Sequence, residues 1–214
     1  MKPPIKFLNL SYYPLGDTTQ YFGENPKLYS QFNMEGHNGI DLVRPWGEPL
    51  YAIEAGEVVA VKNDPHGYGM NVRIVSNNKI NDSYYNEWVF GHTSQNLVKV
   101  GDKVFAGQLI ALMGNTGFTI SGSTPYWKNN PYAGTHVHVG LRQVTKPKSG
   151  GFFYEGSKLR VHVLNHRNGY KGSVDPLSEL RKTEAPEVNR KMYRQLLTIK
   201  SMINSLKKSL SFKK

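Results

Sequence analysis

The chain has 214 residues and a formal net charge of +11, with 27 Lys and Arg against 16 Asp and Glu. A hydrophobic fraction of 38% and 13 tyrosines are enough for a packed core and argue against disorder. The absence of cysteine excludes a disulfide scaffold, a thiolate zinc site and a cysteine nucleophile. A basic surface suits a polyanion, but the charge does not choose among nucleic acid, anionic membrane and cell-wall polymers.

The first 30 residues are predicted to be an irregular lead-in packed on the body, because Gly, Pro, Asn and Asp recur every few residues. Aromatic side chains in and just after this segment are expected to pack it down: Tyr12, Tyr13, Tyr21, Phe22, Tyr29 and Phe32. Instead of packing the lead-in onto the body, Tyr29 could lie beside a functional site at His37.

The N-terminus carries no apolar run of the length that a signal peptide needs. No stretch of about 18 apolar residues occurs either, so no membrane-spanning segment is expected. If the substrate lies outside the cell, we expect another route, such as non-classical secretion or carriage by a virus.

From residue 49 onwards the pattern is that of β-structure. Short β-branched or aromatic runs alternate with turn signals, and strands are expected at residues 49–54, 58–61, 71–75 and 84–90, with a turn region over 77–82. Further strands are expected around residues 98–113 and 135–144. This spacing predicts a mainly antiparallel sheet, sandwich or barrel.

Between the last two of these strands lies a long polar and aromatic loop, residues 115–133. Loops of this length in a compact domain are more often functional than idle. We expect residues 119–132 to form one wall of a groove, with substrate-binding side chains at Tyr126, Trp127 and Tyr132.

The composition changes after residue 182. Apolar residues recur at steps of three and four from Val188 to Leu210, which predicts an amphipathic helix over 183–214. Eight Lys or Arg against two Glu give this segment a net charge of +6. It could bind an anionic surface or a partner, or it could pack on the body. The chain thus divides into a lead-in, a body over 31–182 and a basic helix.

Two pairs of residues carry chemistry. His136 and His138 stand two apart in a predicted strand, so they share one face with Cα atoms roughly 6.5–7 Å apart. His37 and Asp41 stand four apart, and in an extended strand they also share a face. His92 lies between the pairs in an aromatic setting.

Convergence of these pairs would bring two imidazole nitrogens and one carboxylate oxygen together, which is a common catalytic zinc set with the fourth position left to water. One histidine of the second pair would hold the metal and the other would stand beside it. The ligand set favours zinc, while cobalt and manganese remain possible by geometry. The remaining histidines, His66, His162 and His166, are expected in loops or on the surface.

The order of motifs along residues 31–180 resembles that of the lysostaphin/LytM-type zinc endopeptidases, which cut peptidoglycan cross-bridges. The matching stretches are Gly-His-Asn-Gly-Ile-Asp at 36–41, Ala-Gly-Glu-Val-Val-Ala-Val at 55–61, Tyr-Gly-Met-Asn-Val-Arg-Ile at 68–74, Phe-Gly-His-Thr-Ser at 90–94, Val-Gly-Asp-Lys-Val-Phe-Ala-Gly-Gln at 100–108, Met-Gly-Asn-Thr-Gly at 113–117 and Thr-His-Val-His-Val at 135–139.

The resemblance implies a lysostaphin-like β-fold and one Zn²⁺ per chain, held by His37, Asp41 and His138. It implies catalytic roles for His92 and His136. The implied substrates are the stem peptides and cross-bridges of peptidoglycan, and the sequence does not indicate the bond cut or the oligomeric state.

Two departures from the family pattern stand out. Residues 118–134 interpose a long aromatic loop before the His-x-His pair, and Phe90 occupies a position that is usually tyrosine. A catalytically inactive member of the same fold, acting as a wall-binding or regulatory module, is the main alternative. Two further alternatives are weaker. A lipoyl-type carrier does not need paired histidines, and a nucleic-acid binder would be expected to contain a motif that recognises bases, which this sequence lacks.

Overall fold

The computed structural model describes residues 18–121, 124–125 and 131–181. The predicted helix over 183–214 lies outside the described residues, as do Tyr12, Tyr13, Tyr126 and Trp127. None of the described helices has the length and hydropathy of a membrane-spanning segment.

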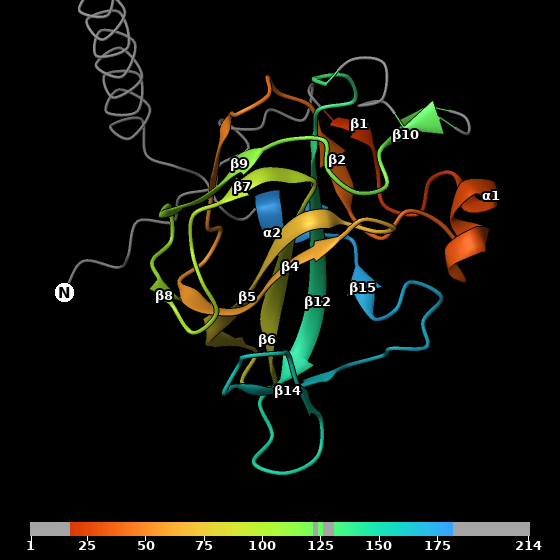
Figure 1. Cartoon of the computed structure of the whole chain (residues 1–214). Helices are drawn as coiled ribbons and strands as arrows, with labels where there is room; N and C mark the ends of the chain where they lie inside the picture. The colour runs from red at the N-terminus through yellow and green to blue at the C-terminus, as the bar shows by residue number, and fades with distance from the viewer. Residues whose placement is uncertain (1–17, 122–123, 126–130, 182–214) are drawn as a thin grey trace, which may run out of the picture.

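The fold is built around one large antiparallel sheet of ten strands (Figure 1). Its main path runs β1-β2-β12-β6-β5-β4-β8, and β13, β14 and β15 join it at β12 and β14. The prediction of a mainly antiparallel β-fold is therefore confirmed. The strands are β1 (Thr18–Gln20), β2 (Ile40–Leu42), β4 (Gly56–Asp64), β5 (Gly69–Ile80), β6 (Tyr84–Gly91), β8 (Lys103–Val104), β12 (Val137–Thr145), β13 (Phe152–Phe153), β14 (Arg160–Val163) and β15 (Ser173–Val174).

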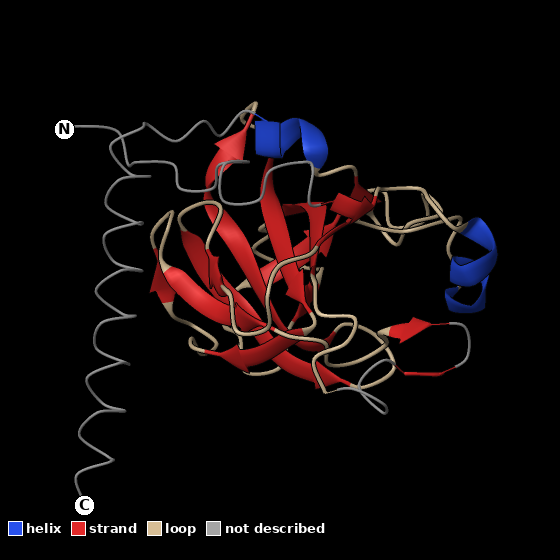
Figure 2. Ribbon diagram, turned by 90° about the horizontal axis from the view of Figure 1, so that it is seen from above, coloured by secondary structure: helices blue, strands red, loops and turns tan. Residues whose placement is uncertain are grey.

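A second sheet of three strands has the order β3-β9-β7, and β10 and β11 form a separate hairpin. The helices are short, and α1 lies on the same side of the molecule as the β10–β11 hairpin (Figure 2). These elements are β3 (Pro49–Tyr51), β7 (Thr93–Asn96), β9 (Leu109–Met113), β10 (Ile120–Ser121), β11 (Thr124–Pro125), α1 (Pro26–Tyr29), the 3₁₀ helix η2 (Ser30–Phe32) and α2 (Leu177–Arg181).

Alternation along the strands separates the hydrophobic core from the functional face. On β12, Val137, Val139 and Leu141 are buried in the main core, together with residues of β2, β6 and β9. Because side chains alternate along a strand, His138 and Arg142 point to the opposite face of the sheet. The same period places Asp41 of β2 on the face of His138, between the core residues Ile40 and Leu42.

Two segments are more regular than the sequence indicated. The turn expected over residues 77–82 is confined to its end, because β5 stays paired with β6 as far as Ile80 opposite Tyr84. The reversal uses Asn81 and Asp82, whose positive φ angles of 50° and 56° suit these residue types. In the lead-in, β1 pairs with β2 and so extends the main sheet.

Candidate metal centre and catalytic groove

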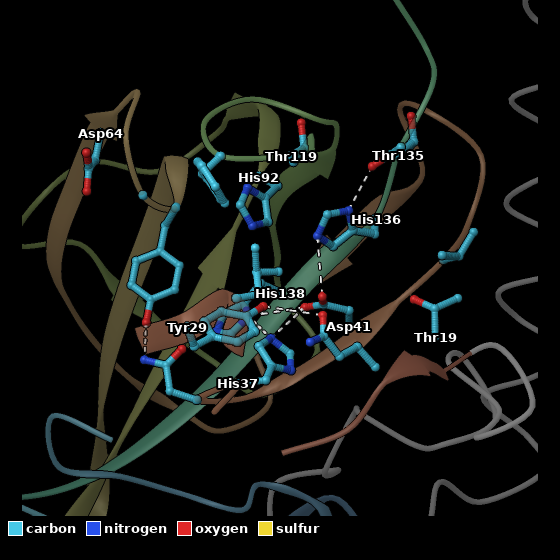
Figure 3. Close-up of a pocket in the computed structure, with 18 of the residues that line it drawn as sticks. Thr19, Tyr29, His37, Asp41, Asp64, His92, Thr119, Thr135, His136 and His138 are labelled. Atoms are coloured by element: carbon cyan, nitrogen blue, oxygen red, sulfur yellow. Dashed lines mark hydrogen bonds and ion pairs between the residues drawn. The ribbon is translucent and has the colours of Figure 1, made fainter. Parts of the chain in front are cut away.

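Strand pairing brings the two ends of the predicted site together. Asp41 of β2 lies directly opposite His138 of β12 in the antiparallel register. His37, which precedes β2, approaches the same point, with 2.8 Å between its Nε2 and Nδ1 of His138. Oδ1 of Asp41 lies 3.1 Å from each of these two nitrogens. The three side chains can therefore offer their ligand atoms to one metal ion (Figure 3).

Glycines make room for the imidazole of His138. A Cβ at Gly39 would lie 2.6 Å from Nε2 of His138 and 2.5 Å from the carbonyl oxygen of Val139. A Cβ at Gly91 would lie 3.2–3.3 Å from the Tyr68 ring and Cβ of His138. Nε2 of His138 is buried without a hydrogen-bond partner among the described residues, so the polar contacts of this ring are all made by Nδ1.

Asp41 is a buried carboxylate surrounded by imidazoles. Burial opposes its ionisation, but the charge of His136 and the hydrogen bonds from His138 and His37 hold its pKa well below the ordinary value. The group is therefore a carboxylate at neutral pH. A buried anion of this kind needs a compensating cation or donor, and the surrounding histidines supply donors in the structure.

His92 is held in one orientation by the backbone. It follows β6 with a φ of 60°, and its amide donates to the carbonyl of Tyr68 over 2.7 Å. Nδ1 lies 2.7 Å from the carbonyl oxygen of Thr116, so Nδ1 carries the proton and Nε2 keeps its lone pair. Burial, followed by the neighbouring charges of His136 and His138, lowers the pKa of His92 to about 3. His92 is thus a neutral imidazole at pH 7.

His136 repeats this arrangement from the other side. It lies one residue before β12, in an isolated bridge with Gly114, and Nδ1 is 2.7 Å from the carbonyl oxygen of Gly134. Its ring centroid is 4.6 Å from that of His92, and its Nε2 is 3.7 Å from Oδ2 of Asp41. Figure 3 shows His92 and His136 on one side of the three clustered side chains. All five predicted metal and catalytic residues thus meet in one place.

The site opens into a cavity of about 1060 Å³. Its walls are rich in aromatic side chains, namely Tyr29, Phe32, Trp46, Tyr68, Phe118 and Tyr132. Tyr132, predicted to bind substrate, is 61% exposed and forms an edge-to-face pair with Trp46, which is 48% exposed. The other two predicted substrate-binding residues lie outside the described part of the chain.

Several side chains line this cavity for which the sequence pattern predicts no functional role. Tyr68 stands in one of the matching motifs, and its hydroxyl accepts from Asn38 over 2.6 Å while its ring lies 4.9 Å from that of His138. His66, expected to be a loop residue, also lines the cavity. His162 and His166 are exposed, as expected.

Phe90, which stands where the family usually has tyrosine, does not line the cavity. Phe90 is 2% exposed and belongs to the main core, on the sheet face opposite to His138. The departure from the tyrosine pattern there therefore changes the core and not the lining of the cavity.

A family model described as "Peptidase family M23" matches residues 35–149. The chain belongs to this family. The matched span contains all five residues of the cluster and most strands of the two sheets, and the lysostaphin/LytM-type resemblance is confirmed.

Two curated relatives show the range of activities among similar proteins. Glycyl-glycine endopeptidase ALE-1 of Staphylococcus capitis is 36% identical over 87 residues, which are 41% of this chain and 23% of that protein. Peptidoglycan DD-endopeptidase ShyA of Vibrio cholerae is 40% identical over 81 residues, which are 38% of this chain and 17% of that protein. The chain thus matches less than a quarter of each relative's length.

Among solved structures, that of LytU is similar over 81% of this chain and 89% of its own, with a TM-score of 0.51 and 25% sequence identity. The likeness therefore extends beyond the residues that the family model matches.

Proposed function

We propose that this protein is a zinc metallo-endopeptidase that hydrolyses peptide cross-links of bacterial peptidoglycan. The observation that carries the proposal is the convergence of His37, Asp41 and His138, with ligand atoms 2.8–3.1 Å apart, beside the imidazoles of His92 and His136. Membership of peptidase family M23 and the names of the two curated relatives support the reaction and the substrate.

The three side chains fit zinc in both chemistry and spacing. Two imidazole nitrogens and one carboxylate oxygen form a frequent catalytic set, and ligands at about 2.0–2.1 Å from a tetrahedral ion stand about 3.3 Å apart. Nδ1 of His37 lies 3.2 Å from the carbonyl oxygen of Tyr21, and a neutral His37 that donates there gives up the Nε2–H contact with Asp41 and presents Nε2 to an ion. When bound, zinc lowers the pKa of its water to about 7 and polarises the scissile carbonyl.

His92 and His136 would move the protons. The Nδ1–H of each ring donates a hydrogen bond to a backbone carbonyl. The Nε2 lone pair of each is therefore available to accept a proton from water. Either imidazolium can then donate to the leaving amine or stabilise negative charge on the carbonyl oxygen. The 4.6 Å between the two ring centroids supports this shared role, because groups so close together could act on one peptide bond.

The aromatic walls would hold the peptide on either side of this bond. Tyr132, at the end of the loop, pairs with Trp46 in the lining of the cavity, and this aromatic wall is a candidate for peptide specificity. The basic segment over 183–214 would add affinity for anionic wall polymers or membranes.

Digestion of purified sacculi tests the proposal. We expect the protein to release muropeptides whose masses correspond to hydrolysis of one peptide bond, and we expect a zinc chelator to stop the release. Sacculi with glycine bridges and with direct diaminopimelate cross-links should be compared, because one curated relative is named a glycyl-glycine endopeptidase and the other a peptidoglycan DD-endopeptidase. Binding to sacculi without any released fragment would favour the catalytically inactive alternative.

A further inference from the structure

The imidazole of His37 is fixed by the lead-in. Its Nδ1 donates to the carbonyl oxygen of Tyr21 over 3.2 Å. Its backbone is bound on both sides by the same stretch, since the amide of His37 donates to the carbonyl of Glu24 and the amide of Gly23 donates to the carbonyl of His37, each over 2.8 Å. The backbone of Gly23 packs closely against Gly36. A Cβ added to Gly36 would lie 2.3 Å from the carbonyl oxygen of Gly23.

Tyr29 completes this support from the face of the ring. Its ring stacks on that of His37, with 5.2 Å between centroids and 30° between planes. The phenol hydroxyl donates to Oε1 of Gln20 on β1 over 3.3 Å, which ties the ring to the main sheet. Tyr29 therefore fixes the plane of the imidazole, while the Tyr21 carbonyl fixes its tautomer.

These contacts come from residues that the family model does not match. The match begins at residue 35, whereas the supporting residues lie between 20 and 29. We propose that the lead-in contributes to the metal site of this protein through the Tyr21 carbonyl and the Tyr29 ring, and that Tyr29 is a positioning residue that holds His37 for the ion. The inference rests on the zinc site proposed above.

The physical reason is that the partners of a metal ligand set its orientation and basicity. Their removal typically lowers metal affinity about 10- to 100-fold. His37 is 1% exposed, so without the Tyr29 ring it would gain rotational freedom that zinc binding would have to remove. The hydroxyl of Tyr29 donates to Gln20, whereas the stacked ring makes the contact with His37 itself, so the ring should carry most of the effect.

Zinc affinity, measured by competition with a chromogenic chelator on the full chain, tests this inference. We expect Tyr29→Leu to weaken zinc binding about 10-fold or more and Tyr29→Phe to stay within about threefold of the wild type, because it keeps the ring. Phe22→Leu is the matched control. Phe22 lies in the same segment, but its ring packs on Tyr170 with 4.5 Å between centroids and does not line the cavity.

Three results would overturn the positioning role while leaving the proposed enzyme intact. These are wild-type zinc affinity in Tyr29→Leu, an equal loss in Tyr29→Phe, and an equal loss in Phe22→Leu, which would indicate general loosening of the segment. Thermal unfolding of each zinc-free variant shows whether it is folded. A wild-type protein that binds no zinc would instead refute the metal site on which the inference rests.

Discussion

His92 and His136 are alike in how they are held, although they come from different parts of the chain. Each gives its Nδ1 proton to a backbone carbonyl at 2.7 Å, and each leaves Nε2 for chemistry. Because these hydrogen-bond partners are backbone carbonyls, changing the side chain at the partner residue should not change the tautomer of the histidine. The proposed proton transfer therefore depends on the two imidazoles themselves.

Substitution of either histidine should separate catalysis from metal binding. We expect His92→Ala and His136→Ala to keep zinc and to lose turnover by a factor of about 10²–10³, the usual loss for one such group. His162→Ala is the control, because His162 is exposed on β14. Rates on a soluble cross-bridge peptide and the zinc content of each variant are the measurements. A variant with wild-type turnover would remove that histidine from the mechanism.

Gly39 is predicted to matter through the ring that packs against it. A Cβ there would lie 2.5–2.6 Å from backbone and imidazole atoms, whereas one at Gly91 would lie 3.2–3.3 Å from its neighbours. We expect Gly39→Ala to displace His138 and weaken zinc binding more than Gly91→Ala does. Chelator competition on both variants gives the comparison, and equal affinities would show that His138 tolerates the displacement.

The sequence predicts the metal residues better than their surroundings. Spacing alone pairs His37 with Asp41 and His136 with His138, because strand alternation fixes which side chains share a face. It does not predict that Tyr29 stacks on His37, since that contact depends on how the lead-in folds back over β2. Local patterns carry no information about such non-local packing.

At the scale of elements, β12 organises both the core and the site. Its odd-numbered residues from Val137 to Leu141 are buried in the core. His138 on the other face meets β2 on one side and β6 on the other. The alternating sequence from Thr135 onwards predicts this strand. The sequence does not predict that β5 extends to Ile80, because Asn and Lys are common in turns. Pairing with β6 keeps these residues extended.

The loop over residues 119–132 is predicted to determine which peptide is cut. It lies next to Phe118, whose ring makes an edge-to-face contact with Phe32 of η2 at 5.0 Å. Shortening the loop should change the ratio of cleavage rates on glycine and diaminopimelate cross-links and leave zinc content unchanged. Mass spectrometry of the released fragments measures that ratio. An unchanged preference would assign the loop a purely structural role.

At the scale of the whole molecule, the buried neutral His92 makes stability depend on pH. Its pKa is about 3 in the folded protein and 6.5 in the unfolded chain. Between these values the unfolded state binds more protons, so stability falls as the pH is lowered from about 6.5 towards 3. One such group contributes at most about 1.4 kcal/mol per pH unit.

His92→Gln should therefore flatten this dependence in chelator-treated protein, because glutamine keeps a donor for the Thr116 carbonyl and does not titrate. Denaturant unfolding at several pH values between 4 and 7 measures the slope, with His162→Gln as the exposed control. Equal slopes in wild type and His92→Gln would mean that the His92 imidazole is accessible to protons in the folded state.

The proposed enzyme requires three side chains, brought together by β2 and β12, to hold one metal ion. Atomic absorption on the purified protein and on His138→Ala tests this most directly. We predict about one zinc per chain in the wild type and none above background in a folded His138→Ala. Zinc at the wild-type level in His138→Ala would contradict the assignment of the site.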